Sequence, residues 1–174
     1  MKRVLFILGQ LSDLDIDWMI NNGAKKELKG GEWLIRQGKE VQSLYIVLSG
    51  KFSVLNEYKQ ELEIASIGPG EVLGEMSFID ARPPEASVLA TEASTIFYIP
   101  RSRVKSKMEK DPGFSARFYL AMSMFLSNRL RSTMNTLGFS IPAEDVDEID
   151  FNVLQQVSQA GARFSQILHK FAEV

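Results

Sequence analysis

Gly74 and Glu75 are the residues of this chain whose types and spacing best suit the binding of a small polar ligand. They follow a glycine-rich turn at 68–70 and open a short predicted helix over 74–79. A helix N-terminus presents unpaired backbone N–H groups and a partial positive charge, so it can hold an anion such as phosphate. Gly74 has no side chain to block a close approach, and the Glu75 carboxylate can accept hydroxyl hydrogen bonds. An ordinary helix start with an acidic first turn would look the same.

The stretch 74–88 resembles the phosphate-binding cassette of cyclic nucleotide-binding domains, the family of catabolite activators and protein kinase A regulatory subunits. That cassette runs Gly-Glu-small-hydrophobic and, several residues later, Arg-Ala/Ser-Ala-x-Val. The run Gly74-Glu75-Met76-Ser77-Phe78 matches the first half. In the second half the arginine position falls on Pro84, Glu85 takes the next place, and Arg82 stands two residues early. The family's rhythm of strands and glycines also continues from Gly30 to Pro100, at Gly31, Ile35, Gly38, Leu44–Val47, Gly50 and Val54.

The resemblance implies a ligand, cyclic AMP or cyclic GMP, and no other cofactor. In the family the backbone and the arginine hold the cyclic phosphate, while the glutamate binds the ribose 2′-hydroxyl. A helix threonine near the position of Thr133 contacts the base. The candidate ligand contacts in this chain are therefore Gly74, Glu75, Met76, Ser77, Arg82, Glu85, Ala86, Ser87 and Thr133.

Pro84 and Glu85 predict that cyclic AMP binds weakly or not at all. Loss of a charge-assisted bond to phosphate costs roughly 1.5–3 kcal/mol, or about ten- to a hundredfold in affinity. A Glu85 carboxylate facing the cavity would add repulsion between like charges. Arg82 could reach a phosphate instead, but we expect it to be a solvated loop residue.

Composition and charge exclude several other classes of protein. The chain has 174 residues, 45% of them hydrophobic, which suits one domain with a helical extension. A net charge of −2 argues against a nucleic-acid binder. The absence of cysteine fits a cytoplasmic protein. With His169 as the only histidine and no Gly-Lys-Ser/Thr phosphate loop, we expect no metal site, no catalytic residues and no enzymatic activity.

No stretch approaches the roughly 20 apolar residues of a membrane span, so we expect no membrane partner. The short apolar run near the N-terminus, 4–11, is expected to pack on the domain. Ser12 is a predicted N-cap for a helix that ends at 21–23.

The middle of the chain predicts an α+β fold built on an antiparallel, jelly-roll-like β-roll of about eight short strands. The apolar run at 44–48 is expected to be a buried strand. Helices should follow at 102–110 and 114–137, separated by a break at Asp111-Pro112-Gly113. The predicted strands are 32–36, 44–48, 51–55, 62–67, 86–90 and 95–99.

Three regions are expected along the chain: a domain over 1–138 that includes the long helix, an acidic linker over 139–150, and an amphipathic helix over 151–174. The last helix should pack against the long one, within the chain or in a partner. The long helix is more apolar than one core-facing stripe requires, which predicts a homodimer. Its core stripe is Phe118, Met122, Phe125 and Leu126, widened by Tyr119, Leu130, Met134 and Leu137.

The function that these features favour is a non-enzymatic sensor domain that signals by ligand-dependent movement of its C-terminal helices. Family members that bind DNA carry a winged helix after the long helix, and no basic recognition helix follows here, so we expect no sequence-specific DNA binding. The alternative is a degenerate domain without nucleotide binding that serves as a dimerisation or protein-docking module, and Pro84 and Glu85 favour it.

Overall fold

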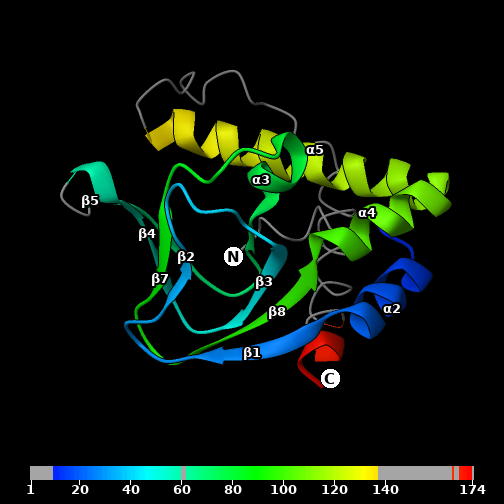
Figure 1. The fold of residues 1–174 in the computed structure, drawn as a ribbon, viewed down its shortest axis with the longest axis horizontal. Helices are drawn as coiled ribbons and strands as arrows, with labels where there is room; N and C mark the ends of the chain where they lie inside the picture. Colours follow the sequence, from blue (N-terminus) through cyan, green and yellow to red (C-terminus); the bar gives the residue numbers. More distant parts are fainter. Residues whose placement is uncertain (1–9, 60–61, 137–165, 167–168, 174) are drawn as a thin grey trace, which may run out of the picture.

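The computed structural model describes residues 10–59, 62–136, 166 and 169–173 (Figure 1). Helix α2 (Asp13–Asn22) precedes the strands, helix α3 (Glu75–Asp80) lies among them, and helices α4 (Arg101–Lys110) and α5 (Pro112–Thr136) follow them. The strands are β1 (Ala24–Leu28), β2 (Trp33–Ile35), β3 (Ser43–Ser49), β4 (Phe52–Asn56), β5 (Leu62–Ile67), β6 (Val72–Leu73), β7 (Ser87–Ala90) and β8 (Ser94–Pro100). A short 3-10 turn, η1 (Glu57–Lys59), follows β4.

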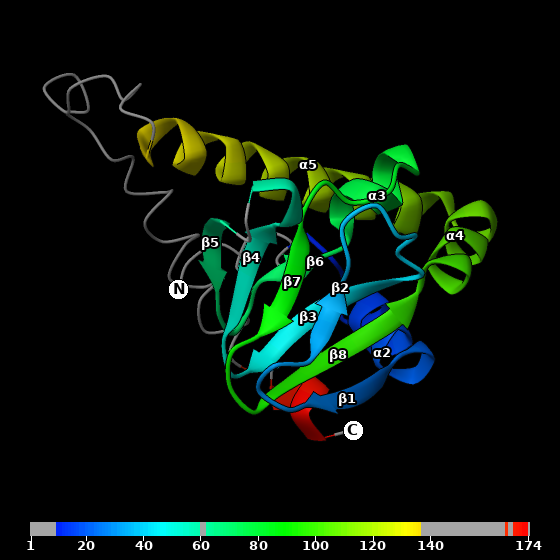
Figure 2. The same cartoon turned by 60° about the vertical axis from the view of Figure 1, so that its left-hand side comes forward.

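The eight strands form two four-stranded antiparallel sheets, in the orders β1-β8-β3-β6 and β2-β7-β4-β5. The sheets face each other, and α5 runs over one end of the roll beside α3 (Figures 1 and 2). This arrangement confirms the predicted α+β fold with an antiparallel roll.

Strand β3 shows why the run 44–48 is apolar at every position. Leu44 and Ile46 face the core between the first sheet and the helices, whereas Val47 faces the core between the two sheets. Because successive strand residues point to opposite faces, a strand covered on both sides needs apolar residues throughout. The prediction of a buried strand here is confirmed.

Helix α5 begins earlier than predicted. The Asp111 carboxylate accepts a hydrogen bond from the Phe114 backbone N–H at 2.9 Å and so caps the new helix. Pro112 then occupies the first helical position, where its missing N–H costs nothing. The predicted break at Asp111-Pro112-Gly113 is wrong for the last two residues, since only Asp111 lies between α4 and α5.

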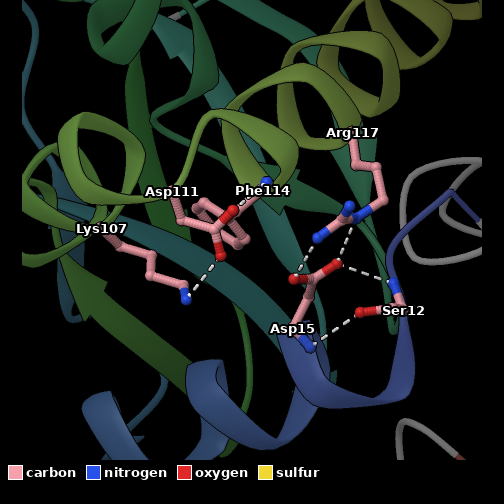
Figure 3. Close-up of polar contacts among 6 residues, drawn as sticks. All are labelled: Ser12, Asp15, Lys107, Asp111, Phe114 and Arg117. Atoms are coloured by element: carbon pink, nitrogen blue, oxygen red, sulfur yellow. Dashed lines mark hydrogen bonds and ion pairs between the residues drawn. The ribbon is translucent and has the colours of Figure 1, made fainter.

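Polar contacts join α2 to the helices that follow the roll (Figure 3). Ser12 and Asp15 form a reciprocal capping box at the start of α2, as expected of Ser12. The Asp15 carboxylate also accepts hydrogen bonds from Arg117 Nε and Nη2 at 2.7 and 2.9 Å. On the neighbouring turn, Lys107 Nζ lies 2.9 Å from Asp111 Oδ2. The Arg117–Asp15 contact therefore links α5 to α2, and the Lys107–Asp111 contact links α4 to the N-cap of α5.

Two strands were absent from the sequence-based prediction. Strand β1 is largely polar and exposed but pairs with β8 along its whole length. Strand β6 has only two residues, which pair with Tyr45 and Ile46 of β3. Neither carries a local signal long enough to reveal a strand.

At the described end of the chain, Phe171 belongs to the same buried core cluster as Phe114 and Phe118 of α5, and it also contacts the first sheet. The Phe171 ring lies 4.5 Å from that of Phe97 on β8, between ring centroids. Lys25 on β1 donates to the Ala172 carbonyl, and Lys170 Nζ lies 3.3 Å from Asp17 on α2. This segment therefore lies against β1, β8 and α2. The rest of the predicted helix, the acidic linker and Leu137 lie outside the described residues.

Candidate functional site

The candidate site begins where strand β6 turns into helix α3, at Gly74. Gly74 has φ +82°, and a Cβ there would lie 2.7 Å from the Ser43 carbonyl oxygen. A residue with a side chain would be strained at this φ and would clash with β3, so glycine is required. The turn directs the next residue, Glu75, into the interior, where its side chain is 4% exposed.

Beside α3 lies a partly open cavity of about 190 Å³, bordered by the loop 82–86 and by Arg129 of α5. Its walls combine apolar side chains of both sheets with the charged residues of α3, the loop and α5. The lining residues are Ile35, Val54, Leu73, Gly74, Glu75, Met76, Ser77, Asp80, Arg82, Pro83, Pro84, Glu85, Ala86, Val88 and Arg129. A largely apolar cavity with a few convergent polar groups is the usual form of a small-molecule site.

Seven of the nine candidate contacts line this cavity, and Ser87 and Thr133 do not. Ser87 is fully buried, accepts a hydrogen bond from the Gln37 N–H at 2.7 Å and donates to Glu57. Thr133 is exposed and donates to the Arg129 carbonyl one turn earlier in α5. Their roles as ligand contacts stay predictions, without support from this geometry.

The Ser87 contacts belong to a polar cluster on the outside of the cavity. Glu57 accepts two hydrogen bonds from Arg36, both at 2.9 Å. The hydrogen bond from Ser87, followed by those from Arg36, lowers the pKa of the Glu57 carboxyl. The Pro84 carbonyl accepts a hydrogen bond from the Gly38 N–H at 2.9 Å. The start of β7 and the loop before it are therefore tied to the segment after β2.

Arg82 is a rim residue. Its side chain is 80% exposed, and its Nε lies 3.8 Å from the Asp80 carboxylate. This placement agrees with the expected solvated loop arginine. Glu85 is exposed at the same rim and lines the cavity, to which it brings a negative charge.

Arg129 is the cavity residue that sequence reasoning missed. Its Nη1 donates to Glu75 Oε1 at 2.6 Å, joining α5 directly to α3. Burial raises the pKa of the Glu75 carboxyl, and the positive charge of Arg129 opposes that rise. A signal was available in the sequence: Arg129 continues the spacing of Phe118, Met122 and Phe125, so it places a cation in the stripe that faces the core.

The described residues contain neither a candidate metal centre nor a helix that could span a membrane. No group of three or more His, Asp or Glu side chains there could hold a metal ion, and His169 lies exposed, 3.1 Å from Glu173. No helix in this part of the chain is long and apolar enough to cross a membrane.

Solved structures share this fold. A cyclic nucleotide-binding domain from Methylobacillus flagellatus superposes with a TM-score of 0.70 at 19% identity, covering 85% of each chain. The catabolite activator protein of Thermus thermophilus superposes with a TM-score of 0.64 at 21% identity, covering 97% of this chain and 87% of the other. At these identities the likeness shows the fold alone.

Curated sequences point the same way. The cyclic AMP receptor protein of Thermus thermophilus is 26% identical over 161 residues, 91% of this chain and 73% of that protein. A type II regulatory subunit of cAMP-dependent protein kinase from Drosophila melanogaster is 36% identical over 67 residues, 38% of this chain but 18% of that subunit. The family model of the cyclic nucleotide-binding domain matches residues 25–111, half of the sequence, from β1 through α4. The chain therefore belongs to the cyclic nucleotide-binding domain family.

Proposed function

We propose that this chain is a non-enzymatic, cytoplasmic regulatory domain that binds a cyclic nucleotide weakly in the cavity between α3, the loop 81–86 and α5. The observation that carries the proposal is the Glu75–Arg129 contact at 2.6 Å, because it joins the cavity to α5. A ligand that competes for Glu75 or Arg129 changes the free energy with which α5 packs over the cavity. It shifts α5 only if it binds the two arrangements with different affinity.

Calorimetric titration with cyclic AMP and cyclic GMP, with 5′-AMP as the non-cyclic control, tests the binding part of the proposal. We expect dissociation constants of roughly micromolar or weaker, since Pro84 offers no charged contact to phosphate. Absence of heat with both cyclic nucleotides at millimolar concentration would contradict the proposal.

Movement of α5 is measured separately. The chain has no cysteine. Two cysteines introduced at the exposed positions Ser127 on α5 and Ser49 on β3 can therefore be labelled with a thiol-reactive probe without background. A ligand-dependent change in the distance between the two labels is expected. An unchanged distance at saturating ligand would leave a binding domain without the proposed output.

The second candidate is a docking module without ligand, and exposed apolar side chains favour it. Leu130 and Met134 on α5 are 61% and 43% exposed, and Leu62 and Ile64 on β5 are each 57% exposed. By contrast, Phe118, Met122 and Phe125 are fully buried within the chain's own core. Of the residues predicted to widen the apolar face of the long helix, the three that the structure describes, Tyr119, Leu130 and Met134, are thus exposed.

We expect this exposed stripe to hold a homodimer through α5. The double substitution Leu130→Glu plus Met134→Glu should convert the dimer to a folded monomer, because it places four charges at a two-fold interface. Light scattering at high micromolar concentration measures the change. The matched control is Ser102→Glu plus Ser106→Glu, which adds the same charges to two exposed residues of α4, away from the exposed stripe of α5. A wild-type chain that runs as a monomer would rule the homodimer out.

A further inference from the structure

The charged groups around the cavity leave a deficit of positive charge. Three carboxyl groups line it, those of Glu75, Asp80 and Glu85, against two guanidinium groups, those of Arg82 and Arg129. A ligand with an anionic phosphate needs a cation within reach, because like charges disfavour its transfer into a site partly shielded from water. Pro84 supplies none.

Arg82 is poorly placed to be that cation. Its guanidinium is mostly in solvent and lies near Asp80, whose other oxygen accepts the Arg82 backbone N–H at 3.0 Å. A contact made from this position would be screened by water and would cost the ordering of a long exposed side chain.

Arg129 has the features that Arg82 lacks. Its side chain is 30% exposed and reaches the cavity from α5, with the guanidinium carbon 5.9 Å from the centre of the Phe125 ring. A guanidinium carries five N–H donors in a planar fork, and the Glu75 contact engages Nη1. The fork can therefore hold Glu75 and an anionic oxygen together, a geometry suited to phosphate.

We propose that Arg129 of α5, rather than a residue of the cassette, contacts the anionic group of the ligand. This inference rests on the proposed function. Glu75 and Arg129 together form a composite site that pairs a hydroxyl acceptor with an anion donor. That combination selects a sugar phosphate, with the hydroxyl at Glu75 and the phosphate at Arg129.

A direct consequence concerns how the ligand acts on α5. When the phosphate contact belongs to the cassette, the charged group of the ligand makes no bond to α5. When it belongs to Arg129, the charged group of the ligand bonds to α5 itself. A nucleoside without phosphate would occupy the cavity without making this bond.

The test compares cyclic AMP with adenosine, by calorimetry, on the wild type and on Arg129→Gln. Loss of a charge-assisted bond should lower the affinity for cyclic AMP by about ten- to a hundredfold. The affinity for adenosine should change by less than about threefold, since adenosine has no anionic group. Arg131→Gln, which removes an exposed arginine of the same helix, is the matched control and should leave both affinities unchanged.

A second comparison removes an indirect effect. Arg129→Gln leaves the Glu75 charge unpaired, which alone could repel a phosphate. In the Glu75→Gln background this repulsion is absent, so the loss for cyclic AMP on adding Arg129→Gln should persist if the contact is direct. Thermal unfolding of each variant confirms that it is folded.

Three results would overturn the inference alone: equal losses for cyclic AMP and adenosine, no loss for either, or a loss that vanishes in the Glu75→Gln background. A loss confined to Arg82→Gln would assign the anion contact to the loop instead. A wild-type chain that binds neither cyclic nucleotide nor adenosine would overturn the proposed function, and this inference with it.

Discussion

Replacing Pro84 with arginine is expected to raise the affinity for cyclic AMP by about ten- to a hundredfold. Pro84 lines the cavity and stands where the family's cassette has its arginine. A guanidinium at this position would add a charge-assisted contact to the phosphate. The hydrogen bond from the Gly38 N–H to residue 84 uses the backbone carbonyl, so the substitution keeps it.

The gain should be larger in the double variant Pro84→Arg plus Glu85→Ala, because the carboxylate at the rim opposes the ligand's charge. Calorimetric titration of wild type, single and double variants with cyclic AMP measures both steps. Pro69→Arg, a proline-to-arginine change on an exposed turn outside the cavity lining, controls for the added charge. Sub-micromolar binding by the wild type, or an unchanged affinity in Pro84→Arg, would show that Pro84 is not the limiting residue.

Replacing Asp15 with asparagine is expected to lower the free energy of unfolding by about 1–2 kcal/mol at neutral pH, after allowance for solvent screening. Asp15 links α2 to α5 through its two hydrogen bonds from Arg117 (Figure 3). Burial would raise the pKa of this carboxyl, but the bonds from Arg117 and Ser12 outweigh burial and hold the pKa at about 2. Asparagine keeps the shape of the side chain but loses the charge.

The lowered pKa of Asp15 also predicts how the free energy of unfolding depends on pH. Because the pKa of Asp15 is lower in the folded chain than its ordinary value of 3.8, the unfolded state binds the proton more tightly. The stabilisation is therefore complete above about pH 4–5 and is lost as the pH falls through about 2. Urea unfolding from pH 7 to pH 2 should show wild type and Asp15→Asn converging at the acid end.

Asp17→Asn is the matched control, since Asp17 lies on the same helix in an exposed pair with Lys170. We expect it to change stability little at any pH. If Asp15→Asn matched this control at neutral pH, or if its effect did not diminish in acid, the contact with Arg117 would not be the stabilising one.

Features that depend on neighbours in the sequence were predictable. Ser12 and Asp15 are three residues apart and cap α2 within one turn. The apolar run of β3 could be identified as a strand covered on both faces, and the spacing along 114–134 marks the buried stripe of α5. The glycine at 74 could be identified as a turn residue before a short helix. Its φ of +82° is the reason that the turn needs glycine.

The partners of individual strands and side chains could be identified only from the tertiary structure. Strand β1 is recognisable only by its pairing with β8, about 70 residues away, because its own residues are mostly polar. Ser87 looks like a cassette contact in the sequence, yet in the fold Glu57 and Gln37 engage its hydroxyl. In the sequence Arg129 is one of several arginines of the long helix. In the fold it forms a hydrogen bond with Glu75 of α3, 54 residues earlier.

The amino-acid sequence by itself indicated the antiparallel roll and the glycine turn at 74 before a short helix, since both rest on periodicity and turn chemistry within a few residues. The family was indicated by the resemblance of the run 74–78 to the cassette, and the family model confirms it. Only the tertiary structure decided which cation meets Glu75. Arg82 is close to Glu75 in sequence, but the turn after α3 leaves it in solvent. Arg129 is distant, but the burial of Phe118, Met122 and Phe125 fixes the rotation of α5 and so brings its guanidinium into the cavity. Apolar contacts along the whole length of α5 thus determine that Arg129 is the cation that meets Glu75, because they set which face of the helix points toward the core.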